Sequence, residues 1–231
     1  MAKPFFVMGA ERAGLLLVEL LLAAHPNLDW GGDFDYAVDW DEPELGDWPP
    51  LVPYWGRLSL CPRVRALRLA IDPSLGFPEL VRSLLDQQQA RSQAVRFGLS
   101  VHGDYDRLLR LFPEADFIYV GRSGGRAGAE PSAGLALRES DRLWRTISAQ
   151  IAPRNRLELR YEQLVASPAS ELARVCELLG VKFERRLIRE AVSLRAPSEQ
   201  AREESPSPGP RRRLAAAFGQ RVAQLLEERG R

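Results

Sequence analysis

A short segment flanked by Gly9 and Gly14 has the composition of an anion-binding turn, because it follows one apolar run and precedes another, Leu15–Ala24. Backbone N–H groups in a turn between a strand and a helix converge on one point, where the helix dipole also favours an anion. A triphosphate-binding loop needs Lys and then Ser or Thr after its second glycine. Leu15 and Leu16 occupy those positions. The turn therefore disfavours a kinase or an ATPase, and a purely structural turn is the alternative interpretation.

Strands that alternate with helices are predicted along the chain, which is typical of a parallel sheet with helices on both faces. The predicted strands span Pro4–Met8, Ala94–Leu99, Asp116–Val120 and Arg156–Arg160. The predicted helices span Leu15–Ala24, Pro78–Gln93, Asp104–Phe112, Arg138–Ile151, Pro168–Leu179 and Arg211–Arg229. We expect one α/β domain over residues 1–231, in which Pro4–Met8 and Asp116–Val120 are neighbouring central strands. Residues 196–210 are rich in Pro, Ser and Glu, which predicts a mobile loop.

The composition is globular, with 45% hydrophobic and 27% charged residues and a net charge of +1. This balance gives no support for a nucleic-acid-binding or membrane-binding surface. Cys61 and Cys176 form no CxxC pair, and two histidines are too few for a zinc cluster. The longest apolar run is too short to span a bilayer, and the N-terminus lacks a signal-peptide cleavage pattern. We therefore expect a cytoplasmic protein that uses no metal, nucleic acid or membrane.

Three segments of the chain resemble, in the same order, the motifs of bacterial sulfotransferases. They are PFFVMGAERAGLLLVELLLAAHP, DRLLRLFPEADFIYVGR and LELRYEQLVASPASELARVCELLGVKF. The resemblance implies a three-layer P-loop α/β fold with a central parallel sheet. It also implies transfer of a sulfuryl group from 3′-phosphoadenosine 5′-phosphosulfate (PAPS) to a hydroxyl or amine.

The loop that holds the 5′-phosphosulfate in this family uses backbone amides, a cation and hydroxyl groups. Three positions match the family's pattern: Gly9, Arg12 and Gly14. Three others lack its hydroxyl groups: Ala13, Leu15 and Leu16. Each donor lost to a charged group is worth about 1.5–3 kcal/mol. We therefore expect binding of PAPS, and of its product 3′-phosphoadenosine 5′-phosphate (PAP), to be weak or absent.

The second phosphate site of the family uses an arginine after the DFIYV strand and a serine on the following helix. Arg122 matches the arginine, while Ser132 lies near the serine's place but out of register. Glu130 stands close to that place, and its charge would repel a phosphate. A basic segment often completes this site, for which Arg211 and Arg212 are candidates. The alternative for these two is a solvated helix end.

Two residues are candidates for the base that deprotonates the acceptor. Asp33, in Gly32-Asp33, stands where many bacterial members have Gly-Glu, and the alternative is one more acidic residue in an acidic loop. His102 resembles the histidine of a Val-His pair in some members, and the alternative is a cap of the next helix. Arg12 would supply the cation at the transferred group. The lysine that often steadies the leaving group near the position of Ser100 is missing.

Residues 29–56 are acidic, lack Lys and Arg, and contain four of the five tryptophans. In the family's order this segment begins the acceptor side, so we expect an insertion or lid that lines the site. An aromatic surface in a negative field suits a cationic or amine-bearing small molecule. The alternative is that the tryptophans pack as core beneath a solvated acidic loop.

Two functions remain open from the sequence. One is an active enzyme with a relaxed site, and the other is a non-catalytic descendant that binds another molecule or protein.

Overall fold

Short apolar segments form a parallel sheet in the computed structural model, which describes residues 3–10, 14–40, 48–122 and 131–184. Within these residues the sheet has five strands, in the order β2 (Leu28–Asp33), β3 (Arg96–Val101), β1 (Phe5–Met8), β4 (Asp116–Gly121) and β5 (Arg156–Arg160). Every neighbouring pair runs parallel. The predicted parallel α/β fold is confirmed, and so is the pairing of β1 with β4 at its centre.

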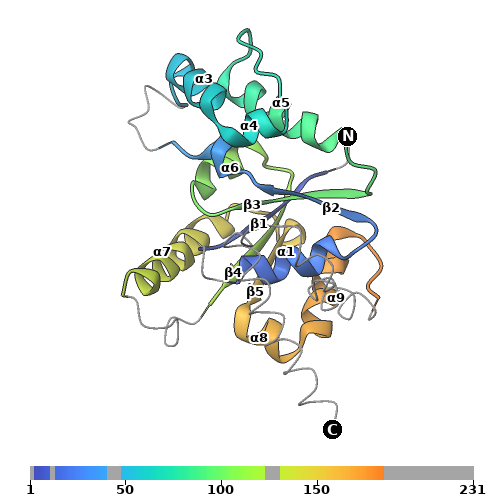
Figure 1. Ribbon diagram of the computed structural model, residues 1–231. Coiled ribbons are helices and arrows are strands. Elements are labelled where there is room, and N and C mark those ends of the chain that lie inside the picture. The colour runs from blue at the N-terminus through green and yellow to red at the C-terminus, as the bar shows by residue number, and fades with distance from the viewer. Residues whose placement is uncertain (1–2, 11–13, 41–47, 123–130, 185–231) are drawn as a thin grey trace, which may run out of the picture.

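Helices cover both faces of this sheet (Figure 1). Those before β3 are α1 (Leu15–Ala23), α2 (Asp35–Val38), α3 (Leu51–Leu60), α4 (Pro62–Ala66) and α5 (Phe77–Gln89). Those after it are α6 (Tyr105–Leu111), α7 (Pro131–Ser148), the 3-10 helix Pro153–Asn155, α8 (Tyr161–Ala166) and α9 (Pro168–Leu179). Helices α1, α8 and α9 lie on one face, and α3 to α6 lie on the other.

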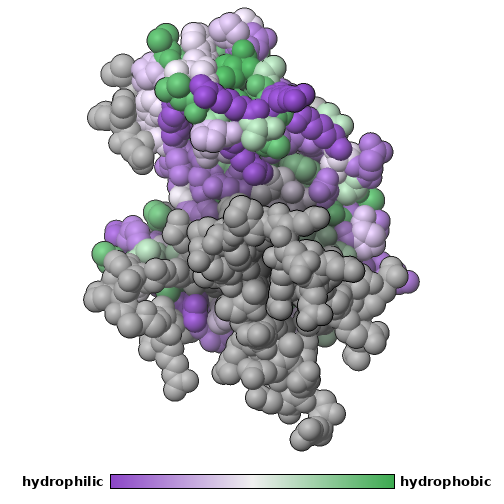
Figure 2. Space-filling model, viewed as in Figure 1, coloured by the Kyte–Doolittle hydropathy of each residue, from purple (hydrophilic) through white to green (hydrophobic). Residues whose placement is uncertain are grey.

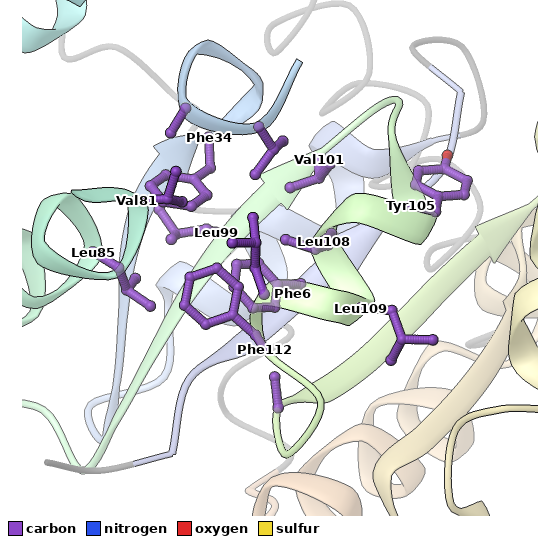
Figure 3. Close-up of a cluster of buried hydrophobic side chains, with 14 of the residues drawn as sticks. Phe6, Phe34, Val81, Leu85, Leu99, Val101, Tyr105, Leu108, Leu109 and Phe112 are labelled. Carbon is purple, nitrogen blue, oxygen red and sulfur yellow. The ribbon is translucent and has the colours of Figure 1, made fainter. Parts of the chain in front are cut away.

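Each face of the sheet packs into its own apolar core, because β1 is buried on both sides. Phe6 and Met8 enter the core beneath α5 and α6, whereas Phe5 and Val7 enter the core beneath α1 and α9. Figure 3 shows Phe6 in the first of these cores, where its ring centroid lies 5.2 Å from that of Phe112. Burial of one such side chain contributes about 1.5–3 kcal/mol, so the two cores fix β1 at the centre of the sheet.

Some elements differ from those expected. Strand β2, of sequence LDWGGD, and helix α3 were not anticipated, because their glycines, prolines and aspartates disfavour regular structure in isolation. Helix α7 begins at Pro131, so the expected start at Arg138 is wrong. Proline is favourable in the first turn of a helix, where its missing N–H costs nothing. The predicted loop 196–210 and helix 211–229 lie outside the described residues.

At the amino end of the strands, a buried carboxylate joins three parts of the chain. Asp116, which is 2% exposed, accepts hydrogen bonds from Lys3 and Arg96, each at 2.5 Å. Arg96 also donates to the carbonyl of Lys3 and to that of Leu179 at the end of α9. Lys3 reaches Asn155 as well, at 3.0 Å. This ion-pair network links β3, β4 and both ends of the described chain.

The surface in Figure 2 shows polar and apolar residues interspersed over the part formed by α3 to α5. Two large apolar side chains of α3, Val52 and Leu60, are exposed by 72% and 71%. Among the described residues no helix is long and apolar enough to cross a membrane. Cys61 and Cys176 are both free thiols.

Candidate functional site

All five strands end at the same edge of the sheet, and this edge collects most of the described polar residues that the sequence singled out. Gly9 follows β1, Asp33 closes β2, His102 follows β3 and Arg122 follows β4. Tyr161 follows β5 directly. Ligands of parallel α/β proteins bind at the carboxyl ends of the strands, so this edge is the candidate site.

His102 is held at this edge by a carboxylate that the sequence analysis did not identify. Its backbone N–H donates to Asp35 Oδ1 at 2.7 Å, and its ring Nδ1 lies 2.5 Å from Asp35 Oδ2. The backbone N–H of Asp35 in turn donates to Asp33 Oδ1 at 2.7 Å. Because Nδ1–H donates a hydrogen bond to the carboxylate of Asp35, the neutral imidazole presents Nε2 as an acceptor. The histidine therefore does not cap the next helix through its side chain.

The electrostatics of the three side chains follow from this arrangement. Burial lowers the pKa of His102, but the hydrogen bond and charge of Asp35, with the charge of Asp33, outweigh it and raise the pKa above 6.5. Burial and the neighbouring charge of Asp35 raise the pKa of Asp33 above its ordinary value. The side chain of His102 is 26% exposed, so a small molecule can reach it.

The same three residues are a possible metal-binding group in the described part of the chain, with ligand atoms within 4.8 Å of one another. Zinc binds nitrogen and oxygen at roughly 2.0–2.2 Å, which places two such ligands about 3 Å apart. The separation of 2.5 Å between His102 Nδ1 and Asp35 Oδ2 is instead that of a charge-assisted hydrogen bond. The geometry is therefore that of an aspartate–histidine pair.

The turn after β1 contacts an aromatic ring that follows the edge strand β5, on the face of the sheet that α1 covers. Gly14 has a φ of 105°, and a Cβ built on it would lie 2.4 Å from Cδ2 of Tyr161. The guanidinium carbon of Arg122 lies 4.5 Å from the centre of the same ring. Tyr161 therefore connects the turn with the residue that follows β4. Helix α1 begins directly after Gly14, and none of the described side chains caps its first turn.

Leu15 does not point to the edge, because it is 2% exposed and belongs to the core beneath α1. The main chain of Leu16 continues the helix. The predicted site residues Arg12 and Ala13, like Arg211 and Arg212, lie outside the described residues, as does Glu130. Ser132 lies in the first turn of α7, and its side chain is outside the described part.

A hydrogen-bonded chain of side chains runs behind the edge from α6 to β5. Tyr105 and Tyr119 share the hydroxyl of Ser140, at 2.9 and 3.2 Å. Tyr119 also donates to Asp141 at 2.7 Å, and Asp141 pairs with Arg160 at 3.3 Å. Burial raises the pKa of both tyrosines, so they are neutral donors. The sequence analysis missed this chain, although Arg160 stands beside Tyr161 in the third family-like segment.

Comparisons with known proteins agree on one family. The model of the sulfotransferase family matches residues 4–185. The sulfotransferase domain of the Synechococcus PCC 7002 olefin synthase is 17% identical, with a TM-score of 0.54 over 100% of this chain and 96% of that one. The sulfotransferase domain from the curacin biosynthetic pathway is 16% identical, with a TM-score of 0.56 over 98% of each chain.

At these identities the two structures show a common fold alone, and no curated protein matches the chain significantly. The family model, however, covers well over half of the chain. The protein therefore belongs to the sulfotransferase family.

Proposed function

We propose that this protein is an active sulfotransferase that transfers a sulfuryl group from PAPS to a hydroxyl or amine acceptor, with His102 as the general base. The hydrogen-bonded pair of Asp35 and His102 carries this proposal. It stands at the carboxyl ends of β2 and β3, beside the turn that follows β1.

The role of His102 follows from its proton positions. Nδ1–H of His102 donates a hydrogen bond to Asp35, so the lone pair of Nε2 can accept a proton from the acceptor's nucleophilic group. The charge of Asp35 then stabilises the imidazolium that forms. Asp35 does not touch the acceptor and is a positioning residue.

The described residues also fit a phosphate-bearing donor, although with fewer hydroxyl groups than the family uses. Gly9 and Gly14 both have positive φ angles before α1, and Arg122 lies against Tyr161, the first residue of α8. PAPS would supply the sulfuryl group: the acceptor bonds to sulfur as the bond from sulfur to the 5′-phosphate oxygen breaks, and PAP leaves. The backbone amides and Arg122 would hold its phosphates.

The test is sulfuryl transfer from radiolabelled PAPS to a panel of small alcohols and amines. His102→Gln should lower kcat by about 10²–10⁴-fold, because proton transfer by a positioned base contributes that much. His25→Gln is the matched control, since His25 is 4% exposed and bonds to the carbonyl of Lys182 away from the site. Circular dichroism checks that both variants fold. Unchanged transfer by His102→Gln would refute the role of this residue.

One observation favours a second function, a non-catalytic binding protein. Leu15 stands where the family has a hydroxyl donor, and its side chain is committed to the core. The thermal shift produced by PAP separates the two functions. A folded protein that neither binds PAP nor transfers the sulfuryl group would have lost the activity and kept the scaffold.

A further inference from the structure

The corner of the edge where β2 meets β3 has more negative than positive charge. Its members are Asp33, Asp35, Ser100 and His102, which we call the β2–β3 corner. Asp35 is paired with His102. Asp33 accepts a hydrogen bond from a backbone N–H, and no ion pair with it is seen among the described residues. Arg63, which approaches neighbouring Gly32, donates to the carbonyl of Gly31 instead. Among the described residues, Asp33 therefore has no cationic side chain paired with it.

A buried hydroxyl lies in the same corner. Ser100 is 1% exposed, and its Oγ makes no hydrogen bond to any described residue. The register pairs Ser100 with Val7 and with Asp33, so their side chains share the face that α1 covers. His102 follows directly after the end of β3 and is hydrogen-bonded to Asp35. A carboxylate and a hydroxyl thus share one face of two adjacent strands, and an imidazole stands just past their ends.

We infer that the β2–β3 corner binds the ammonium group of an amino-alcohol acceptor, with Asp33 as its counter-ion. The inference rests on the proposed function, because it places the reacting hydroxyl of the same acceptor at Nε2 of His102. An ammonium has three N–H donors, which suits a carboxylate oxygen and a nearby hydroxyl. The acceptor would therefore contact two groups of the corner: Asp33 would pair with its ammonium, and His102 would accept the proton of its hydroxyl.

The corner favours an ammonium over the other small ligands. A neutral alcohol would leave the half-buried charge of Asp33 unpaired, and an anionic acceptor would be repelled by both carboxylates. A divalent metal would have to part His102 Nδ1 from Asp35 Oδ2, which share a hydrogen bond of 2.5 Å. An ammonium needs no such rearrangement.

The experiment compares amino alcohols of two to six carbons with diols of the same length, by calorimetric titration of the full chain. At the best chain length, the amino alcohol should bind about ten- to a hundredfold more tightly than the diol of the same length, as expected for hydrogen bonds to a charged group. Asp33→Asn should remove this preference, while Asp33→Glu should keep most of it. Asp29→Asn is the matched control, because Asp29 lies at the opposite, exposed end of the same strand.

Binding is measured without PAPS, so this inference and the proposed function can fail separately. A preference for amines that depends on Asp33, without any sulfuryl transfer, would support the amine site and refute the proposed function. Equal affinity for amino alcohols and diols, together with sulfuryl transfer to both, would refute the amine site and support the proposed function. Displacement of the amine by Mn²⁺ or Zn²⁺ at micromolar concentration would show a metal site instead. A preference that persists in Asp33→Asn would also overturn the inference.

Discussion

His102 makes two hydrogen bonds to one carboxylate, through its main chain and through its ring. This double contact fixes both the position and the tautomer of the imidazole. It also explains why the pKa is raised although the ring is largely buried, since burial acts in the opposite direction. At the residue scale, the site is therefore set by Asp35, which lies 67 positions away in the sequence.

The pH dependence of transfer tests this pairing. The base must be neutral, so the rate should fall as the pH drops through the pKa of His102, which lies above 6.5. Asp35→Asn removes the charge that raises this pKa, so the inflection should move to lower pH while kcat falls by about a hundredfold or more. The measurement is kcat/KM against pH for both proteins. An inflection at the same pH in both would assign it to another group.

At the scale of elements, the turn before α1 is in contact with Tyr161, which follows β5, the strand two places from β1 in the sheet. Gly14 adopts a left-handed backbone conformation, and the ring of Tyr161 occupies the space that a side chain at this position would need. The ring also lies against Arg122, so the segments that follow β1, β4 and β5 meet at one residue. We expect this turn to be sensitive to changes at Tyr161.

Gly14→Ala should destabilise the fold by about 1–3 kcal/mol, because it adds backbone strain and a clash with Tyr161. Gly180→Ala is the matched control, since Gly180 has a φ of 67° with no atom near its missing side chain. It should cost about 1 kcal/mol from strain alone. Urea unfolding measures both. If the clash matters, Gly14→Ala combined with Tyr161→Ala should cost less than the sum of the single changes.

The sequence predicted the elements that are apolar along their length and missed those that depend on pairing. Strand β4, which reads DFIYVG, is buried at every position and is evident from its residues. Strand β2 contains two glycines and two aspartates, and it is a strand because β3 supplies its hydrogen-bonding partner. For the same reason Asp33 and His102 were predicted separately, whereas their link through Asp35 required the register of the two strands.

The tryptophan-rich segment 29–56 has described residues both in the core and at the candidate site, the two roles that its composition allowed. Trp40 is 9% exposed and packs in the core near Tyr54, with the guanidinium of Arg57 5.2 Å from its ring centre. Asp33 and Asp35, from the same segment, stand at the site. Composition alone could not separate these roles, because aromatic residues stabilise a core and line a site equally well. That the segment acts as a lid remains a prediction.

At the scale of the whole molecule, the amino and carboxyl ends of the strands carry different groups of charged side chains. The amino edge holds Asp116 between Lys3 and Arg96, and the carboxyl edge holds the aspartate–histidine pair. Strand β3 connects them, with Arg96 at its start and His102 just past its end.

Asp116→Asn should destabilise the protein by about 3–5 kcal/mol, because it leaves the guanidinium of Arg96 buried without a counter-charge. The matched control is Asp106→Asn, which removes the partner of Arg110 in an exposed pair at 3.2 Å. That change should cost less than about 1 kcal/mol. Denaturant midpoints for the two variants provide the comparison. Similar losses would mean that the buried pair contributes no more than a surface pair.

The burial of Leu15 has a consequence for anyone who wishes to rebuild the donor loop. A threonine there would carry a hydroxyl, but on a side chain that the helix directs into the core beneath α1, and it would remove apolar volume from that core at a cost of about 2 kcal/mol or more. Restoring the family's residue at this position alone therefore costs core stability. Because β3 spans roughly 20 Å, the free energy gained from a stabilising change at the amino end of the sheet would add independently to the effect of a change at Leu15. The sensible order of engineering is to reinforce that distant end first and revise the loop afterwards.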